Sequence, residues 1–212
     1  MDRIAASGLV PVVRIERAQD APELARTLAA AGLPCIEITF RSDAAEDAIR
    51  AIRAEVPEVL VGAGTVVSID QLNRALDAGA SFVVSPGFQA DVVRACLDRS
   101  VPVLPGVYTP TEIIQAMDFG LSVVKLFPAA SAGGTAYLRA LAGPFPQMRF
   151  VPTGGIDLGN LESYLRVPSV IAVGGSWMVP LHLLVGREWA MVGKLATEAT
   201  EVVQAVRSGP AR

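Results

Sequence analysis

Residues 59–86 read VLVGAGTVVSIDQLNRALDAGASFVVSP and contain one complete alternation of strand, helix and strand. The two ends, 59–66 and 82–86, are short apolar runs, whereas apolar residues between 69 and 78 recur at helical spacing. Gly79 follows the helical segment, where a left-handed cap is needed before the next strand. Because both strands are apolar on both faces, we expect them to be parallel and covered by crossover helices.

The same unit recurs along the chain, and Gly32 and Gly120 end helical segments as Gly79 does. Further strands are predicted at 9–15, 35–40, 101–107, 122–128, 149–156 and 170–177, and further helices at 21–31, 43–54, 89–99, 111–119 and 188–207. This alternation predicts an α/β fold of the TIM (β/α)8 barrel class, formed as a single domain by residues 1–212 with a flexible tail at 208–212. A doubly wound open sheet is the alternative, but no G-x-G-x-x-G motif opens the first helix.

The composition limits the classes of partner. Of the 212 residues, 51% are hydrophobic and 18% are charged, which indicates a large core for this length. The net charge of -3 comes from scattered residues without a Lys/Arg run, so no nucleic acid partner is expected. No apolar run is long enough to span a membrane, and the apolar stretch 4–13 lacks a signal-peptide cleavage site. We therefore expect a soluble protein with a small-molecule substrate.

The cysteines and the histidine bear on compartment and cofactor. Cys35 and Cys96 form no C-x-x-C pair, which favours reduced thiols in the cytoplasm. His182 is the only histidine, which argues against a histidine-rich zinc centre and disfavours a histidine-dependent triad. No metal or other cofactor is predicted.

Active sites of barrels lie at the carboxyl ends of the strands, so polar residues at those positions are the candidates. They are Arg14, Glu37, Arg41, Thr65, Lys125, Thr153 and Ser176.

Lys125 is the least expected residue, because it stands in the apolar run SVVKLFP at 122–128. Burial disfavours the charged ammonium, and a neutral amine is the form that attacks a carbonyl to make a Schiff base. The alternatives are a lysine that points outward along the barrel surface and a buried structural ion pair.

Glu37 interrupts the apolar run CIEITF at 35–40 in the same way. Strand alternation places Glu37, Thr39 and Arg41 on one face, so a carboxylate and a guanidinium would meet inside the barrel. A structural pair between Glu37 and Arg41 is the alternative to a site.

Glycines mark three further strand ends. Gly62-Ala63-Gly64-Thr65 would let a ligand approach the backbone closely, although a simple tight turn is the favoured interpretation of this run. The runs 152–155 and 174–176 stand at the ends of the last two strands, where barrels frequently bind phosphate. Their amides, Ser176 and the N-terminus of a following helix could bind a dianion, and turn glycines are again the alternative.

Taken together, the motifs resemble those of the 2-keto-3-deoxy-6-phosphogluconate (KDPG) aldolases, including forms that also cleave 4-hydroxy-2-oxoglutarate (KHG). The resemblance covers about residues 7 to 180 and is strong because the motifs occur in order. They are IEIT at 36–39 with Arg41, VGAGTV at 61–66, SPG at 85–87, PGV at 105–107 with TPTE at 109–112, KLFPA at 125–129, AGPF at 142–145, PTGGI at 152–156 and GGSW at 174–177.

The resemblance implies a role for each matching residue. Lys125 takes the place of the Schiff-base lysine and Glu37 that of the general acid and base. Arg41 and Thr65 fall on the binders of the pyruvyl carboxylate. The phosphate site falls on Gly154, Gly155, Gly174, Gly175 and Ser176, and the substrate-binding set is completed by Thr153, Pro86, Phe127 and Arg14.

The expected function is that of a class I aldolase, a carbon-carbon lyase of the Entner-Doudoroff pathway that cleaves KDPG to pyruvate and glyceraldehyde 3-phosphate. Cleavage of KHG to pyruvate and glyoxylate and a homotrimeric assembly are also implied. Thr153 and Ser176 favour the gluconate epimer over the galactonate one, whereas Tyr108 departs from the family's smaller residues beside the site. The alternatives are a galactonate-type aldolase, a non-covalent sugar-phosphate isomerase or decarboxylase on the same barrel, and a barrel without catalysis.

Overall fold

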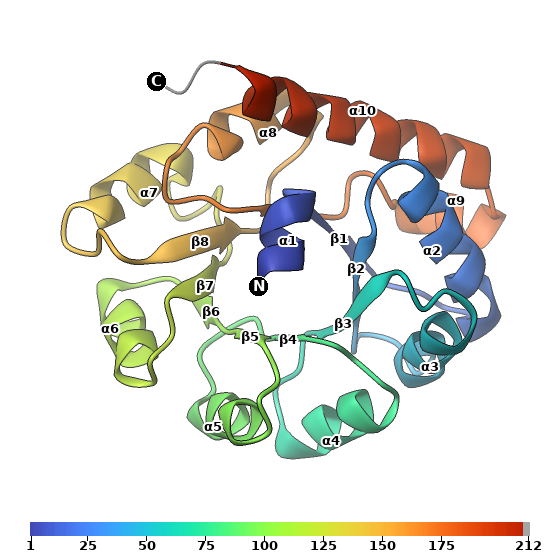
Figure 1. The fold of residues 1–212 in the computed structure, drawn as a ribbon, viewed down its shortest axis with the longest axis horizontal. Coiled ribbons are helices and arrows are strands. Elements are labelled where there is room, and N and C mark those ends of the chain that lie inside the picture. The colour runs from blue at the N-terminus through green and yellow to red at the C-terminus, as the bar shows by residue number, and fades with distance from the viewer. Residues whose placement is uncertain (210–212) are drawn as a thin grey trace.

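The structure is a computed structural model that describes residues 1–209, and its strands form a ring of parallel neighbours (Figure 1). One sheet has the order β5-β4-β3-β2-β1-β9 and the other the order β6-β7-β8. The strands are β1 (Leu9–Val13), β2 (Cys35–Thr39), β3 (Leu60–Gly64), β4 (Val83–Val84), β5 (Val103–Leu104), β6 (Gly106–Val107), β7 (Val123–Leu126), β8 (Arg149–Pro152) and β9 (Val173–Gly175).

The two sheets join at both ends. Only Pro105 separates β5 from β6, so these two segments form one strand of the barrel. The nine segments β1 to β9 therefore occupy eight barrel positions. On the other side, parallel bridges link Phe150 to Val170 and Thr153 to Gly174. The predicted (β/α)8 barrel is therefore confirmed, and the open doubly wound sheet is excluded.

Helices surround the ring (Figure 1). The outer helices are α2 (Ala21–Ala30), α3 (Ala45–Glu55), α4 (Ile69–Asp77), α5 (Ala90–Asp98), α6 (Pro110–Asp118), α7 (Gly134–Ala142), α8 (Leu158–Leu165) and α10 (Trp189–Ser208), with short helices α1 (Asp2–Ser7), η1 (Ala18–Asp20) and α9 (Leu181–Gly186). The predicted glycine caps are confirmed, since Gly32, Gly79 and Gly120 have φ values of 85°, 94° and 76°. The strands predicted at 149–156 and 170–177 are shorter: β8 ends at Pro152, before the positive-φ pair Gly154-Gly155, and β9 covers only Val173–Gly175.

The apolar residues form two cores, one on each side of the strands. The larger core lies between the strands and the outer helices, where α10 packs against α2 and α8. The smaller core fills the inside of the ring and consists of Ile4, Val10, Cys35, Phe82, Val84, Leu104, Val151 and Ala172. This double burial explains why the predicted strands are apolar on both faces.

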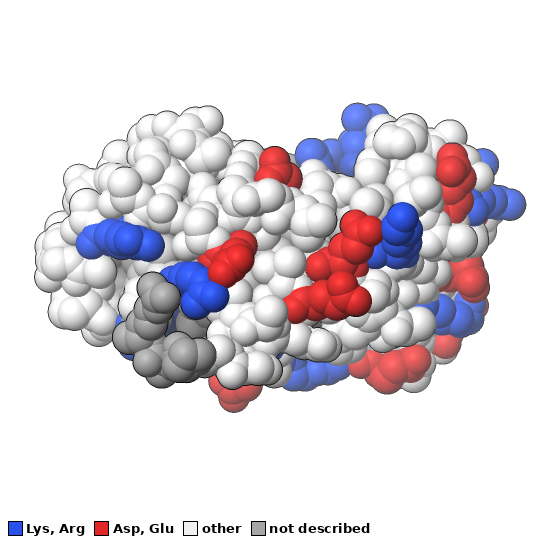
Figure 2. Space-filling model, turned by 90° about the horizontal axis from the view of Figure 1, so that it is seen from above, with Lys and Arg blue, Asp and Glu red and all other residues white. Residues whose placement is uncertain are grey.

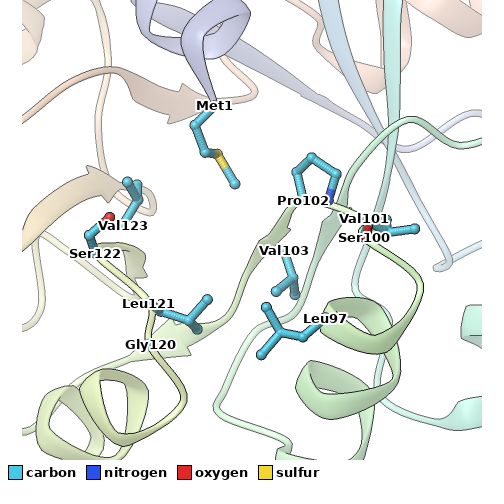
Figure 3. Close-up of a pocket in the computed structure, with 10 residues that line it drawn as sticks. All are labelled: Met1, Leu97, Ser100, Val101, Pro102, Val103, Gly120, Leu121, Ser122 and Val123. Carbon is cyan, nitrogen blue, oxygen red and sulfur yellow. The ribbon is translucent and has the colours of Figure 1, made fainter.

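Helix α1 closes the amino end of the barrel, because Ile4 is 1% exposed and belongs to the inner core. The apolar stretch 4–13 is thus the end of α1, a left-handed turn at Gly8 and strand β1. At this end Figure 3 shows a pocket of about 340 Å³ into which Met1 points. Its lining carries no ionisable side chain, so no side chain of this pocket can act as an acid or a base in catalysis.

Helix α10 lies at the carboxyl end of the described chain, and charged residues are scattered over one face of the surface (Figure 2). Helix α10 extends through Ser208, so the predicted tail is wrong at residue 208, and residues 210–212 of that prediction lie outside the described residues. Figure 2 shows acidic and basic side chains interspersed among uncharged residues on one face. Between residues 1 and 209, none of the helices combines the length and the apolar character needed to cross a membrane.

Candidate active site

Lys125 and Glu37 face each other inside the barrel. They belong to β7 and β2, which lie on opposite sides of the ring (Figure 1). Their side chains are 8% and 4% exposed, and Nζ of Lys125 lies 3.8 Å from Oε1 of Glu37. This placement excludes an outward-pointing lysine. A buried amine beside a buried carboxylate is the pair that imine chemistry requires.

Both groups remain available to a ligand. Oε1 of Glu37 has no hydrogen-bond partner among the described residues. The separation from Lys125 exceeds the usual hydrogen-bond range of about 2.7–3.2 Å. On its other side, Nζ lies 5.2 Å from the centroid of the Phe127 ring, within the range of a cation–π contact. Phe127 therefore forms one wall of the space around the amine.

Two glycines of β3 make the space that these side chains occupy. A Cβ atom on Gly64 would lie 2.1 Å from Oε1 of Glu37, and one on Gly62 would lie 2.3 Å from the Phe82 ring. Neither glycine has a positive φ, so neither forms the tight turn that the sequence allowed. Gly64 makes room for the carboxylate, and Gly62 makes room for the ring beneath it.

A second part of the site is a pocket of about 190 Å³ at the carboxyl ends of β1, β2 and β9. Arg14, Arg41 and Ser176 line it together with Val12, Val179, Pro180 and Leu181. Within the described chain no ion pair joins Arg41 to Glu37, so the alternative of a structural pair between them is excluded. Two guanidinium groups and a hydroxyl in one small pocket suit an anionic ligand. The sequence had placed Arg41 and Ser176 at opposite ends of the substrate.

The two predicted phosphate loops lie side by side. Gly154 and Gly155 follow β8 with φ values of 99° and 73°. A Cβ atom on Gly174 would lie 2.3 Å from Oγ1 of Thr153, and one on Gly154 would lie 3.3 Å from the Phe127 ring. Gly175 is buried next to Gly174 in β9. The glycines are therefore needed for close packing here, and the loops border the space around Lys125.

The help expected from a following helix N-terminus stays a prediction at both loops. After Ser176, helix α9 begins only at Leu181. After Gly155, helix α8 begins at Leu158, and the amides of Gly159 and Asn160 donate to Oδ1 of Asp157 at 2.9 Å and 3.2 Å. Two amides of the first turn of α8 are thus already hydrogen-bonded.

The remaining predicted residues lie on the rim. Thr65 follows β3 with a left-handed φ of 60°, a conformation that is uncommon outside glycine. Pro86 packs its carbonyl against β6, since a Cβ atom on Gly106 would lie 2.2 Å from that oxygen. Tyr108 is 42% exposed, and its carbonyl accepts a hydrogen bond of 2.7 Å from the hydroxyl of Tyr137. The departure from the family at Tyr108 therefore stands at the entrance.

Sequence reasoning missed Glu16 as a partner of the site, although it pairs with Arg14 at 2.8 Å and lies two residues away, a spacing that the strand period could have flagged. Strand alternation did place Thr39 on the face of Arg41, and the hydroxyl of Thr39 accepts a hydrogen bond of 3.0 Å from Nε of Arg41.

The same spacing brings Cys35 beneath Glu37. Burial, assisted by the Glu37 carboxylate, raises the pKa of the Cys35 thiol to about 12. The thiol is therefore held in its neutral form. Among residues 1–209, no three His, Cys, Asp or Glu residues gather in a way that could hold a metal ion.

The chain is similar to known aldolases over most of its length. The model of the family "KDPG and KHG aldolase" matches residues 1–195. A 2-dehydro-3-deoxy-phosphogluconate aldolase of Treponema pallidum is 50% identical over 92% of this chain and 93% of its own. The KHG/KDPG aldolase of Escherichia coli K12 is 44% identical over 91% of each chain.

Among solved structures, a KDPG aldolase from Legionella pneumophila superimposes with a TM-score of 0.90 and 38% identity. The match covers 93% of this chain and 96% of that one. That structure holds pyruvate captured at low pH as a covalent carbinolamine intermediate.

Proposed function

The chain belongs to the KDPG and KHG aldolase family, and on this premise we propose that it is a class I aldolase that cleaves KDPG to pyruvate and glyceraldehyde 3-phosphate. The observation that carries the proposal is the buried amine of Lys125 beside the unpartnered carboxylate of Glu37. It supports a reaction through an imine, because that reaction needs a nucleophilic amine and a nearby proton carrier.

Lys125 begins the reaction by attacking the C2 ketone of the substrate. The resulting carbinolamine loses water and becomes an iminium, which can accept the electron pair of the C3–C4 bond. Cleavage of that bond releases glyceraldehyde 3-phosphate and leaves the enamine of pyruvate. Protonation at C3 and hydrolysis then release pyruvate and restore the amine.

Glu37 carries the protons of these steps. Its carboxylate relays a proton during loss of water from the carbinolamine, and it then removes the proton of the C4 hydroxyl, directly or through a water. Its position supports this role, since Oε1 is buried, lies 3.8 Å from Nζ of Lys125 and makes no competing hydrogen bond within residues 1–209.

Binding groups on both sides of Lys125 orient the substrate. We assign the pyruvyl carboxylate to Arg41 and Thr65, and we assign Pro86 and Phe127 to the walls around the ketone. The phosphate is assigned to Thr153, Gly154, Gly155, Gly174, Gly175 and Ser176, with Arg14 adding positive charge at the rim. Because the phosphate is remote from the breaking bond, its binding energy can serve to position the reacting atoms.

A second substrate, KHG, fits the same chemistry. The name KHG/KDPG aldolase of the E. coli relative supports it. KHG cleavage needs the amine, the proton carrier and the carboxylate clamp but no phosphate site. Thr153 and Ser176 support KDPG over its galactonate epimer.

The decisive experiment measures imine formation and turnover on the purified chain. Borohydride added with pyruvate should attach one reduced pyruvyl group to the protein, detected by intact mass. Release of pyruvate from KDPG, from its C4 epimer and from KHG should then be compared in an assay coupled to lactate dehydrogenase. Turnover of a sugar phosphate without a trapped adduct would favour the non-covalent isomerase or decarboxylase instead. Absence of any turnover would favour a barrel without catalysis.

Assembly and compartment are part of the proposal. A homotrimer follows from the family resemblance, and light scattering on the purified chain would test it. A cytoplasmic location is supported by Cys35 and Cys96, which are both free thiols. Fractionation of cells that produce the protein would test that location.

A further inference from the structure

The Thr39 hydroxyl both donates and accepts a hydrogen bond at the carboxyl ends of β1 and β2. It is the last residue of β2 and is 1% exposed. Its hydroxyl donates to the carbonyl of Val13 at 2.7 Å, and it accepts from Nε of Arg41 at 3.0 Å. A hydroxyl carries one proton. Because that proton goes to Val13, the oxygen can offer Arg41 only an acceptor, which is what a guanidinium needs.

This contact determines which edge of Arg41 is left for a ligand. Arg41 is an exposed residue that forms no ion pair within residues 1–209, so its long side chain would otherwise sample many rotamers. With Nε bound to Thr39, the edge formed by the two terminal nitrogens stays free where Arg41 lines the pocket with Arg14 and Ser176. That edge can grip a carboxylate with two hydrogen bonds.

The loop that carries Arg41 is held by two further contacts. The amide of Arg41 donates to the carbonyl of Thr39 at 2.7 Å. The hydroxyl of Ser42 donates to the carbonyl of Ile15, in the segment that follows β1. These contacts position the backbone, whereas within residues 1–209 the hydrogen bond that holds the guanidinium is the one to the Thr39 hydroxyl.

We propose that Thr39 is a positioning residue that orients the Arg41 guanidinium toward the carboxylate of the substrate. The inference rests on the proposed function, in which Arg41 binds that carboxylate. A guanidinium held in its bound orientation loses less conformational freedom when the ligand arrives, so the effect belongs to binding. Loss of the hydroxyl should therefore raise KM and leave kcat nearly unchanged.

The test compares Thr39→Val, which removes the hydroxyl at similar volume, with Thr39→Ser, which keeps it. The probe is pyruvate, whose half-saturating concentration is measured by borohydride trapping. Thr39→Val should raise this concentration about 10-fold, as expected for one lost hydrogen bond to a charged group, and should keep kcat for KDPG within about two-fold. Thr39→Ser should stay within about two-fold in both quantities. Thr39→Ala, which also lacks the hydroxyl, replaces the valine variant if melting curves show that the latter is unfolded.

The double variant shows whether Thr39 acts through Arg41. Arg41→Gln should raise the half-saturating concentration by itself, and addition of Thr39→Val should raise it no further. Additive effects, or a Thr39→Val variant that binds pyruvate like the wild type, would overturn the positioning role while leaving the aldolase intact. Absence of trapping in the wild-type protein would instead overturn the proposed function and this inference with it.

Discussion

Nζ of Lys125 lies 3.8 Å from Oε1 of Glu37 although the two residues come from opposite sides of the barrel. A buried ion pair is stable only if its geometry is close and the remaining lone pairs are satisfied, and here Oε1 has no hydrogen-bond partner in the described chain. The pair is therefore poorly optimised for stability. It is well suited to pass protons between the carboxylate and a group bound to the amine.

Lys125→Ala should abolish imine formation and nearly all turnover. The chain contains only two lysines, so Lys194→Ala is a complete matched control and should keep both activities. The intact mass of each variant after treatment with borohydride and pyruvate shows whether a pyruvyl group has been attached. A pyruvyl adduct on Lys125→Ala, which could only be on Lys194 or the amino terminus, would refute the assignment. Because the variant also leaves Glu37 buried alone, we expect it to lose up to about 3 kcal/mol of unfolding free energy, partly restored by Glu37→Gln.

Gly64→Ala and Gly62→Ala should separate activity from stability. The new methyl group at residue 64 would meet Oε1 of Glu37 and should displace the carboxylate, which lowers kcat at least about 10-fold. At residue 62 it would meet the Phe82 ring in the inner core and should cost about 1–3 kcal/mol of stability. Steady-state kinetics and denaturant unfolding on both variants provide the comparison. Similar kcat values for the two variants would show that Gly64 has no special relation to Glu37.

The recurrence along the chain of the alternation seen in residues 59–86 was enough to predict the barrel, because burial on both faces of a strand leaves a simple apolar pattern. The same pattern located Glu37 and Lys125 as charges in apolar strands. It could not show that they meet, because a contact across the ring depends on strand tilt and register, which no local period encodes.

Local features were missed for other reasons. Helix α7 begins at the pair Gly133-Gly134, where both residues have positive φ, so its start carries no capping signal. The Asp157 cap at the start of α8 was not predicted, and it engages the amides of Gly159 and Asn160. Strand spacing placed Thr39 and Arg41 on one face, but it could not show that the Thr39 hydroxyl accepts from Nε of Arg41.

Chelation with EDTA should leave the activity unchanged. The prediction rests on the donor inventory, because His182 is the only histidine and both cysteines are buried in separate elements. An iminium on Lys125 would already supply the electrophile that a metal provides in other aldolases. Activity lost on dialysis against EDTA and restored by a divalent ion would argue for a metal held by carboxylates.

Cys35 should make stability fall at alkaline pH. Burial, with the Glu37 carboxylate nearby, raises the pKa of its thiol from 9.0 to about 12. The thiol of the unfolded chain ionises at a lower pH than the buried thiol, and its ionisation favours the unfolded state. The stability that comes from the neutral buried thiol is therefore fully present below pH 9 and is lost as the pH rises toward 12. Between pH 7 and 10 the wild type should lose about 1.4 kcal/mol more than Cys35→Ala in urea unfolding. Equal losses would mean that the thiol ionises in the folded protein.

Ser176→Ala should distinguish phosphorylated from unphosphorylated substrates. Ser176 follows the buried pair Gly174-Gly175 and shares its pocket with Arg14 and Arg41, so its hydroxyl could face either anionic group of the substrate. If it binds the phosphate, the variant should raise KM for KDPG through loss of a hydrogen bond to a charged group, worth about 1.5–3 kcal/mol. Cleavage of KHG, which has no phosphate, should change much less. Both substrates are measured on one preparation, so misfolding would lower both activities and would be recognised in the melting curve. Equal losses in a protein that melts like the wild type would place Ser176 beside the carboxylate clamp of Arg41, and the phosphate would then have to be bound by the glycine loops without it.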